Sequence, residues 1–145
     1  MGKRHLRADE RIRSTRNLVK SLRKMRGITD SHRRTMLRHA LFLLTEAEWT
    51  NKYKTRFCSK TALTAAKEKL RHDHVFPRAK MVDALLQSSA DSVDDILNDA
   101  VGCTITIDEH ALLNKFEDFD GWERYRKAGI TVIDTATGKA LHFKK

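Results

Sequence analysis

The spacing of apolar residues changes along this chain, and that change constrains the fold more than any other feature of the sequence. A narrow apolar stripe recurs at helical spacing over residues 9–26, and a broader stripe follows over residues 30–49. Both patterns predict helices, the second with its apolar face in the core. Residues 103–107 alternate instead and are rich in β-branched side chains, which predicts a strand. The chain is therefore expected to adopt an α+β fold that is mostly helical.

Turn and capping residues divide the rest of the chain. We expect Gly27 to end the first helix, residues 50–60 to form a loop, and residues 60–70 to form a further helix. Helical spacing also predicts short helices over residues 81–86 and 93–97.

The C-terminal third carries its own signals. Thr106 followed three residues later by Glu109 is a capping-box pattern, so a helix should begin at about Ile107. A short helix is predicted over residues 122–128, with Gly129 as its stop. Residues 130–134 and 140–143 flank a turn at Thr137-Gly138, and we expect a C-terminal β-hairpin there.

Pro77 is the only proline in the chain. Because the residue before a proline avoids helical geometry, the segment from His72 to Phe76 is predicted to be extended. Successive side chains of a strand point to opposite faces, so His72 and His74 should share one face and Asp73 should lie on the other. Two imidazoles and a carboxylate this close together can bind a divalent cation and activate water near neutral pH.

Positive charge is concentrated at the N-terminus. Residues 1–38 hold thirteen lysines and arginines and three acidic residues, whereas residues 39–145 hold sixteen of each kind, so the net charge of +10 lies in the first quarter. Such a block favours nucleic acid, because each neutralised phosphate releases counterions and arginine can fork two bonds to one phosphate. A solvated basic face is the alternative. We expect a basic helical arm over residues 1–38 and a single α+β domain over residues 39–145. The predicted nucleic-acid contacts are Arg11, Arg16, Lys20, Arg23, Lys24, Arg26, Arg33, Arg34 and Arg78.

Chain length, hydropathy and cysteine spacing argue against a two-domain protein, a membrane protein and a disulfide- or zinc-stabilised protein. A chain of 145 residues with 40% hydrophobic residues is long enough for one core and too short for two ordinary domains. It has no apolar run near the roughly 18 residues that cross a bilayer, and it lacks the apolar stretch of a signal peptide, so no membrane partner is expected. Cys58 and Cys103 have no paired spacing, which favours free thiols in the cytoplasm over a disulfide or a structural zinc site.

The order of these elements resembles a known family. A strand with Asp73-His74, an intervening segment, a second strand and then a helix that bears His110 near its start are similar to the HNH, or ββα-metal (His-Me finger), endonucleases. The resemblance covers residues 71–115, about a third of the chain. It implies a small ββα-metal-like core within the larger domain and a metal-dependent endonuclease that hydrolyses phosphodiester bonds of DNA.

The resemblance also implies roles for individual residues. His74 would be the general base that deprotonates water, and Asp73 would be a metal ligand. His110 and Asn114, four residues apart, would complete the metal site, and Asn98 is the one candidate for the family's middle asparagine. The implied cofactor is a divalent metal, Mg²⁺ first and Mn²⁺ second, since Mg²⁺ accepts few protein ligands and keeps several waters.

Several points stay open at the level of sequence. His72 is a substrate contact, an alternative base or a bystander. The expected partner is double-stranded DNA, and two cuts in a duplex by so small a protein favour a homodimer. The alternative function is a non-catalytic DNA- or RNA-binding protein whose histidines are structural. A third is a regulator that acts on another protein through the acidic and apolar surface of residues 91–99.

Overall fold

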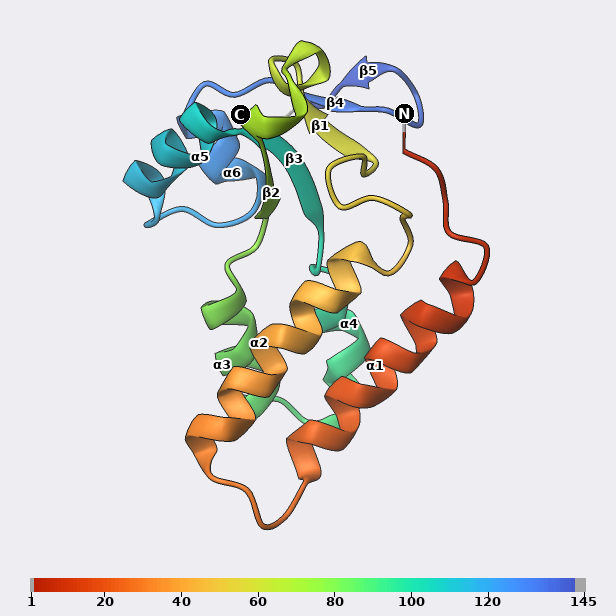
Figure 1. Ribbon diagram of the computed structural model, residues 1–145. Coiled ribbons are helices and arrows are strands. Elements are labelled where there is room, and N and C mark those ends of the chain that lie inside the picture. The colour runs from red at the N-terminus through yellow and green to blue at the C-terminus, as the bar shows by residue number, and fades with distance from the viewer. Residues whose placement is uncertain (1, 143–145) are drawn as a thin grey trace.

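The computed structural model describes residues 2–142 and has a helical half and a sheet half (Figure 1). The α+β class is confirmed. The helices are α1 (Ala8–Lys24), α2 (Asp30–Glu46), α3 (Arg78–Gln87), α4 (Val93–Leu97), α5 (Ile107–Leu113) and α6 (Trp122–Lys127). The strands are β1 (Phe57–Ser59), β2 (Leu70–His74), β3 (Gly102–Thr106), β4 (Val132–Asp134) and β5 (Lys139–Ala140).

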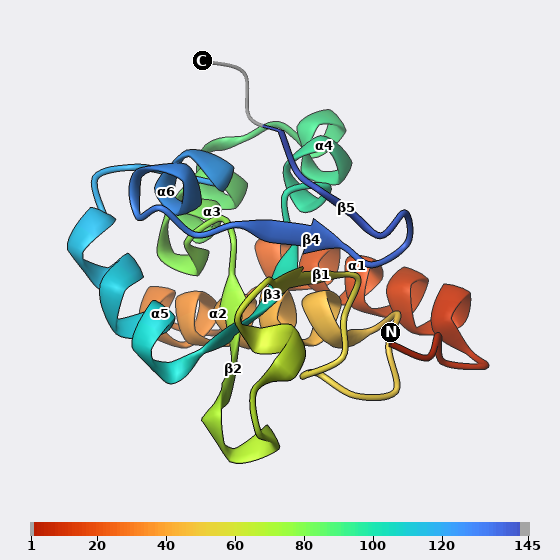
Figure 2. The same cartoon turned by 90° about the horizontal axis from the view of Figure 1, so that it is seen from above.

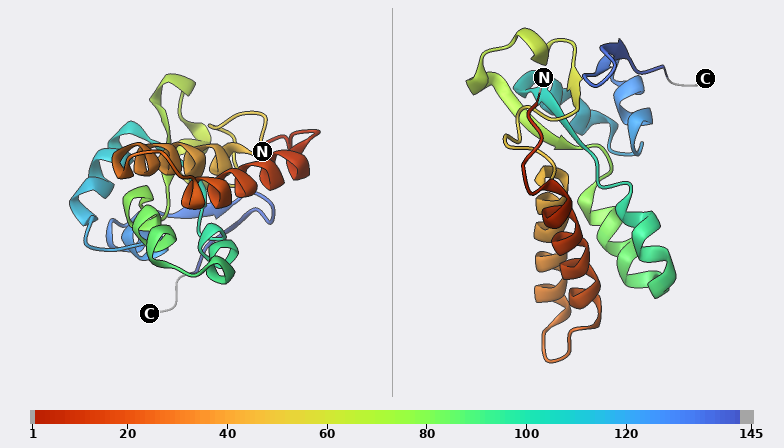
Figure 3. Two further views of the ribbon diagram at one scale, coloured as in Figure 1. Left: turned by 90° about the horizontal axis from the view of Figure 1, so that it is seen from below. Right: turned by 90° about the vertical axis from the view of Figure 1, so that its right-hand side faces the viewer.

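The helical half is a hairpin of α1 and α2 packed against α3 and α4. The two predicted N-terminal helices are confirmed, and Thr29 caps the second by accepting a hydrogen bond from the His32 backbone N–H. Val19, Leu37 and Leu41 lie in one core cluster with residues of α3 and α4. The right-hand view of Figure 3 shows both helix pairs extending away from the sheet, with the α1–α2 turn at the far end. Residue 38 falls inside α2, so the basic segment shares its core with the rest of this half.

The sheet has five strands in the order β2-β3-β1-β4-β5. Strand β3 is antiparallel to β2 and parallel to β1, and β4 is antiparallel to both of its neighbours. Figure 2 shows β2 and the β4–β5 hairpin on opposite sides of the two central strands. A core beneath the sheet gathers buried side chains from β3, β4 and α6, among them Ile105, Tyr125 and Val132.

Two predictions near the middle of the chain are wrong. The expected loop over residues 50–60 contains β1, a central strand. The expected helix over residues 60–70 is replaced by two 3₁₀ turns, Ala62–Thr64 and Lys67–Lys69, followed by the start of β2. The physical reason is tertiary, because β1 obtains its hydrogen bonds from β3 and β4, and such pairing overrides the weak propensity of a short segment.

The predicted start of α5 is confirmed. Thr106 and Glu109 form a capping box, in which the Thr106 hydroxyl accepts from the Glu109 backbone N–H and the Glu109 carboxylate accepts from the Thr106 backbone N–H. Ser59 also donates to Glu109 at 2.6 Å. The cap therefore fixes α5 both to β3, which it follows, and to the end of β1.

The C-terminal elements also follow the sequence pattern. Helix α6 ends before Gly129, which has a left-handed φ of 72°. Strands β4 and β5 form the expected hairpin, although Phe143, which we included in its second strand, lies outside the described residues. Among residues 2–142, every helix is too short or too polar to traverse a bilayer.

Candidate active site

A pocket of about 320 Å³ lies at the junction of the two halves. Helix α2, strand β2, the first turn of α3, and helices α5 and α6 each contribute to its wall. Its lining residues are Arg38, Phe42, His72, Asp73, His74, Pro77, Arg78, Ala79, His110 and Arg124. The strand that carries Asp73-His74 and the helix that carries His110 therefore meet at one pocket.

Strand β2 presents its two histidines to one face, as predicted. The ring centroids of His72 and His74 are 5.5 Å apart, and both rings contact Phe42 of α2. Asp73 lies on the other face and is buried. The antiparallel register places Asp73 opposite Cys103 and His74 opposite Gly102.

His72 is held by hydrogen bonds at both ring nitrogens. Its Nδ1 is 2.9 Å from the Lys52 carbonyl, and its Nε2 is 3.0 Å from the Thr45 hydroxyl. A neutral ring donates from Nδ1 to the carbonyl and leaves Nε2 as an acceptor, so the one proton of the Thr45 hydroxyl is shared between Nε2 and the Phe42 carbonyl, which lies 2.7 Å from that hydroxyl. Burial lowers the pKa of His72, which favours that neutral form. With both nitrogens engaged, this histidine is suited to a structural role rather than to proton transfer.

His74 has a different environment. Its Nε2 is buried and has no hydrogen-bond partner among the described residues. Burial, together with the positive charge of Arg78, lowers the pKa of His74 to about 3, so the ring is neutral at pH 7. The unused nitrogen of this neutral ring can accept a proton, but a pKa this low makes the ring a weak base until nearby negative charge offsets the charge of Arg78.

Asp73 is locked into a buried polar cluster. Arg124 Nη2 donates to Asp73 Oδ2 at 2.6 Å, and the Tyr125 hydroxyl donates to the same oxygen. Burial raises the pKa of this carboxyl, against the opposite effect of the two donors. Arg124 Nη2 also donates to the His74 carbonyl at 2.9 Å. Helix α6 thereby holds both the Asp73 side chain and the His74 carbonyl of β2.

A glycine sets the position of α6. Gly121 precedes the helix with φ of 60°, and a Cβ there would lie 2.6 Å from the Phe76 ring. Only a residue without a side chain allows this backbone conformation together with so close an approach. Phe76 packs against both core clusters, so this contact places Arg124 at the junction of the two halves.

Two arginines meet on the other side of the pocket. Arg78 Nη1 donates weakly to the Arg38 carbonyl at 3.5 Å, and its guanidinium lies 5.9 Å from the centroid of the Phe42 ring. Burial, together with the charge of Arg38, lowers the pKa of Arg78. Among the described residues neither Arg38 nor Arg78 forms an ion pair, so two like charges stand near each other without a carboxylate.

Two of the predicted site residues lie elsewhere. Asn98 follows α4, and its side chain accepts a hydrogen bond from Arg16 of α1 at 2.8 Å. Asn114 is exposed in a 3₁₀ turn after α5 and does not line the pocket, although His110 does. The structure therefore brings together Asp73, His74 and His110 and leaves the two asparagines outside.

The predicted nucleic-acid contacts divide into three groups. Most are engaged within the protein: Arg11, Arg23 and Arg33 donate to backbone carbonyls, Arg16 and Lys20 pair with Asp94, and Arg34 pairs with Asp83. Lys24 and Arg26 are exposed beside the α1–α2 turn and have no ion pair within the described part of the chain. Arg78 lines the pocket.

The residues predicted to hold Mg²⁺ do not fit that ion in this arrangement. Asp73 is the one carboxylate among the described lining residues, and one of its oxygens already accepts from Arg124 and Tyr125. Within residues 2–142, no three histidine, cysteine or carboxylate side chains gather as ligands of one ion. Mg²⁺ prefers oxygen ligands, and guanidinium groups repel a cation. The lining is therefore suited to an anion.

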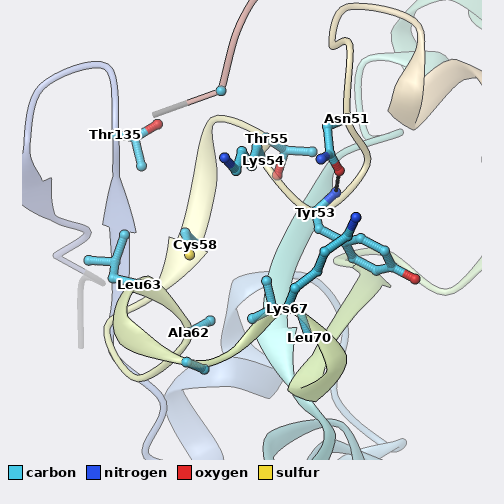
Figure 4. A pocket seen from close by; sticks show the side chains of 12 residues that line it. Asn51, Tyr53, Lys54, Thr55, Cys58, Ala62, Leu63, Lys67, Leu70 and Thr135 are labelled. Carbon is cyan, nitrogen blue, oxygen red and sulfur yellow. Dashed lines mark hydrogen bonds between the residues drawn. The ribbon is translucent and has the colours of Figure 1, made fainter.

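A second pocket, of about 290 Å³, lies between the segment around Tyr53, the two 3₁₀ turns and Thr135 (Figure 4). Its described lining has no histidine and no carboxylate, and its one thiol is Cys58. Burial raises the pKa of Cys58 to about 11, so the thiol stays protonated at neutral pH and is a poor nucleophile. The pocket at β2 is therefore the better candidate for chemistry.

Sequence analysis missed several members of the site. These are residues of two helices, which lie about thirty residues before β2 or about fifty after it: Arg38, Phe42, Arg124 and Tyr125. In the sequence, Arg38 belongs to the basic block of residues 1–38, and Tyr125 lies within the short helix predicted over residues 122–128. No local pattern links these residues to Asp73.

Comparison with known proteins found no match to this chain among family models, curated proteins or solved structures. What the pocket does is therefore inferred from its own residues.

Proposed function

We propose that this protein is an endonuclease that hydrolyses phosphodiester bonds of nucleic acid in the pocket at β2. The observation that carries this proposal is the arrangement around His74. His74, a neutral imidazole with a buried and unpartnered nitrogen, lines the same pocket as three arginines and the exposed imidazole of His110. A phosphodiester needs both a base for the attacking water and positive charge for its oxygens.

The chemistry follows from these positions. His74 takes a proton from a water molecule, whose oxygen attacks phosphorus while the bond to the leaving oxygen breaks. The guanidinium groups of Arg38 and Arg78 neutralise the charge that builds on the phosphoryl oxygens. The leaving oxygen takes up a proton, for which His110 is the candidate donor. The products are a phosphomonoester and a free hydroxyl group.

The α1–α2 hairpin supplies the means of holding the substrate. Lys24 and Arg26 are exposed at its outer end, which lies away from the sheet (Figure 1). A cationic hairpin of this kind binds the phosphate backbone without regard to sequence, and the pocket then contacts the scissile phosphate. Duplex DNA, a homodimer that cuts both strands and a cytoplasmic location remain part of this proposal.

The test is cleavage of supercoiled plasmid by the purified protein in Mg²⁺, in Mn²⁺ and in EDTA. His74→Ala should lower the nicking rate at least a hundredfold, because a positioned general base contributes about 10²–10⁴ in rate. His39→Ala is the matched control, since His39 is an exposed histidine of α2 outside the pocket and its loss should leave nicking unchanged. Nicking by His74→Ala at the wild-type rate would refute the assignment. The EDTA arm tests the predicted dependence on a metal.

A non-catalytic nucleic-acid-binding protein is the second candidate. The observation that favours it is His72, whose two nitrogens are both used in holding β2 against α2 and the Lys52 segment. Intact plasmid in every arm, together with a gel shift that weakens steeply with salt, would support this alternative.

A further inference from the structure

Two buried nitrogen atoms single out the pocket at β2. His74 Nε2 and Arg124 Nε are the only buried side-chain nitrogen or oxygen atoms in residues 2–142 without a hydrogen-bond partner, and both residues line this pocket. Buried polar groups are nearly always hydrogen-bonded, so an orphaned pair at one place indicates that a bound molecule or water supplies the partners. Arg124 Nε carries a proton, and its partner must therefore be an acceptor.

The charges of the pocket indicate the sign of that molecule. Among the described lining residues there are three guanidinium groups, from Arg38, Arg78 and Arg124, and one carboxylate, from Asp73. Arg124 neutralises that carboxylate through the 2.6 Å ion pair. Arg38 and Arg78 have no acidic partner among the described residues. Their two positive charges therefore repel each other without compensation. An anion between them removes this repulsion.

We infer that the pocket binds a phosphate group directly through the guanidinium groups of Arg38, Arg78 and Arg124, without a divalent cation between protein and phosphate. Arginine presents a planar fork of donors that matches two oxygens of a phosphate. The volume of about 320 Å³ is roughly ten times the share of one water molecule in the liquid, so a phosphate group and several waters fit. The inference rests on the proposed function only for the source of the phosphate, a diester of nucleic acid.

The binding test uses the intact protein in EDTA and two probes, inorganic phosphate and a dinucleoside phosphodiester. Two-dimensional NMR of the arginine Nε–H groups follows each titration. At least one probe should bind in EDTA and shift the Arg124 Nε–H signal, and added Mg²⁺ should leave the affinity within about twofold. The tighter probe identifies the source of the phosphate, as a free anion or as a diester.

Variants connect the binding to the arginines. Arg78→Gln and Arg38→Gln should each weaken the affinity at least tenfold, and Arg78→Lys should recover only part of the loss, because lysine keeps the charge but not the fork. Arg34→Gln is the matched control: Arg34 lies one helical turn before Arg38 on α2, pairs with Asp83 at 2.6 Å and does not line the pocket. Circular dichroism checks that each variant is folded.

The inference fails if neither probe binds in EDTA, if binding requires Mg²⁺, or if Arg34→Gln weakens binding as much as Arg78→Gln does. These outcomes are separable from those of the cleavage test. A protein that binds phosphate in EDTA but never nicks plasmid supports the phosphate site and refutes the nuclease. A protein that nicks plasmid but binds phosphate only with Mg²⁺ supports the nuclease and refutes the metal-free phosphate site.

Discussion

Arg124 of α6 forms a buried ion pair with Asp73 of β2, with 2.6 Å between Nη2 and Oδ2 and about 8% of each side chain exposed. The same guanidinium nitrogen donates to the His74 carbonyl. The pair therefore connects a C-terminal helix to the strand that carries the proposed base. Because Arg124 neutralises Asp73, the one carboxylate of the described pocket lining adds no net negative charge to the site.

Removing Arg124 should destabilise the protein strongly. Arg124→Met leaves Asp73 buried without its counter-ion, and breaking one side of a buried pair costs roughly 3–5 kcal/mol. Urea unfolding followed by circular dichroism measures the loss. The double variant Asp73→Asn/Arg124→Met should be more stable than Arg124→Met alone, because no unpaired charge remains. Arg126→Met, two residues along the same helix, removes an exposed pair with Glu123 and should change the urea midpoint little. Equal losses for Arg124→Met and Arg126→Met would contradict the prediction.

Gly102 should tolerate a side chain only when the His72 ring is removed. A Cβ at Gly102 would lie 2.4 Å from His72 Cε1, so Gly102→Ala must displace the ring from Thr45 or from the Lys52 carbonyl. We expect a loss of roughly 1–3 kcal/mol in unfolding free energy, as for other overpacked cores. A double-mutant cycle checks the cause, since the same change in a His72→Ala background should cost clearly less. The same cost in both backgrounds would show that the ring is not the obstacle.

Stability should fall in acid because of the buried histidines. The folded-state pKa of His74 is about 3, below its ordinary value of 6.5. Between these values the unfolded chain binds a proton that the folded protein does not, so this contribution is complete above about pH 6.5 and is lost as the pH falls toward 3. The slope is at most about 1.4 kcal/mol per pH unit for one group.

A comparison of variants isolates the effect of His74 on the pH dependence. His72, whose pKa is also lowered by burial, acts in the same sense as His74, and Asp73, whose pKa is raised by burial, acts in the opposite sense, so the wild-type slope is a sum over all three. His74→Gln removes only the His74 contribution and should give a shallower dependence of the urea midpoint between about pH 6 and pH 4. Superimposable pH curves for the two proteins would show that His74 titrates normally.

Salt dependence should distinguish basic residues at the hairpin end from those engaged within the fold. If Lys24 and Arg26 contact phosphates, the double variant Lys24→Ala/Arg26→Ala should reduce the slope of log affinity against log salt by about 0.9 for each lost contact. The matched double variant Arg16→Ala/Lys20→Ala removes two residues that pair with Asp94 and should leave the slope nearly unchanged. Fluorescence anisotropy with labelled duplex DNA measures both slopes. A larger change in the Arg16/Lys20 variant would place the DNA on the α1–α4 side.

The elements predicted correctly are those whose signals are local. Helix α2 lies within the apolar stripe predicted over residues 30–49, α5 begins at the Thr106–Glu109 capping box, and β2 alternates its side chains before Pro77. Each of these features depends on hydrogen bonds or steric limits among residues a few positions apart. A single sequence contains all the information that they need.

The features that local signals missed depend on distant partners. Strand β1 forms because β3 and β4 pair with it. Residues 60–70 form two 3₁₀ turns and the start of β2 instead of the expected helix. Predicting either requires knowing which strands become neighbours. Propensity over three to ten residues does not hold that information.

The sequence by itself determined the α+β class, the basic N-terminal helices and the pairing of His72 with His74 on one face of a strand. Only the tertiary structure decided what surrounds that strand. It brought Arg124 and Tyr125 to Asp73 across 51 and 52 residues of chain, and it brought Arg38 to Arg78 across 40. These contacts surround the strand of the predicted metal site with guanidinium groups, which are suited to an anion. The physical reason is that the charge of a pocket is the sum over all elements that line it, and packing of the two cores, not local spacing, selects those elements.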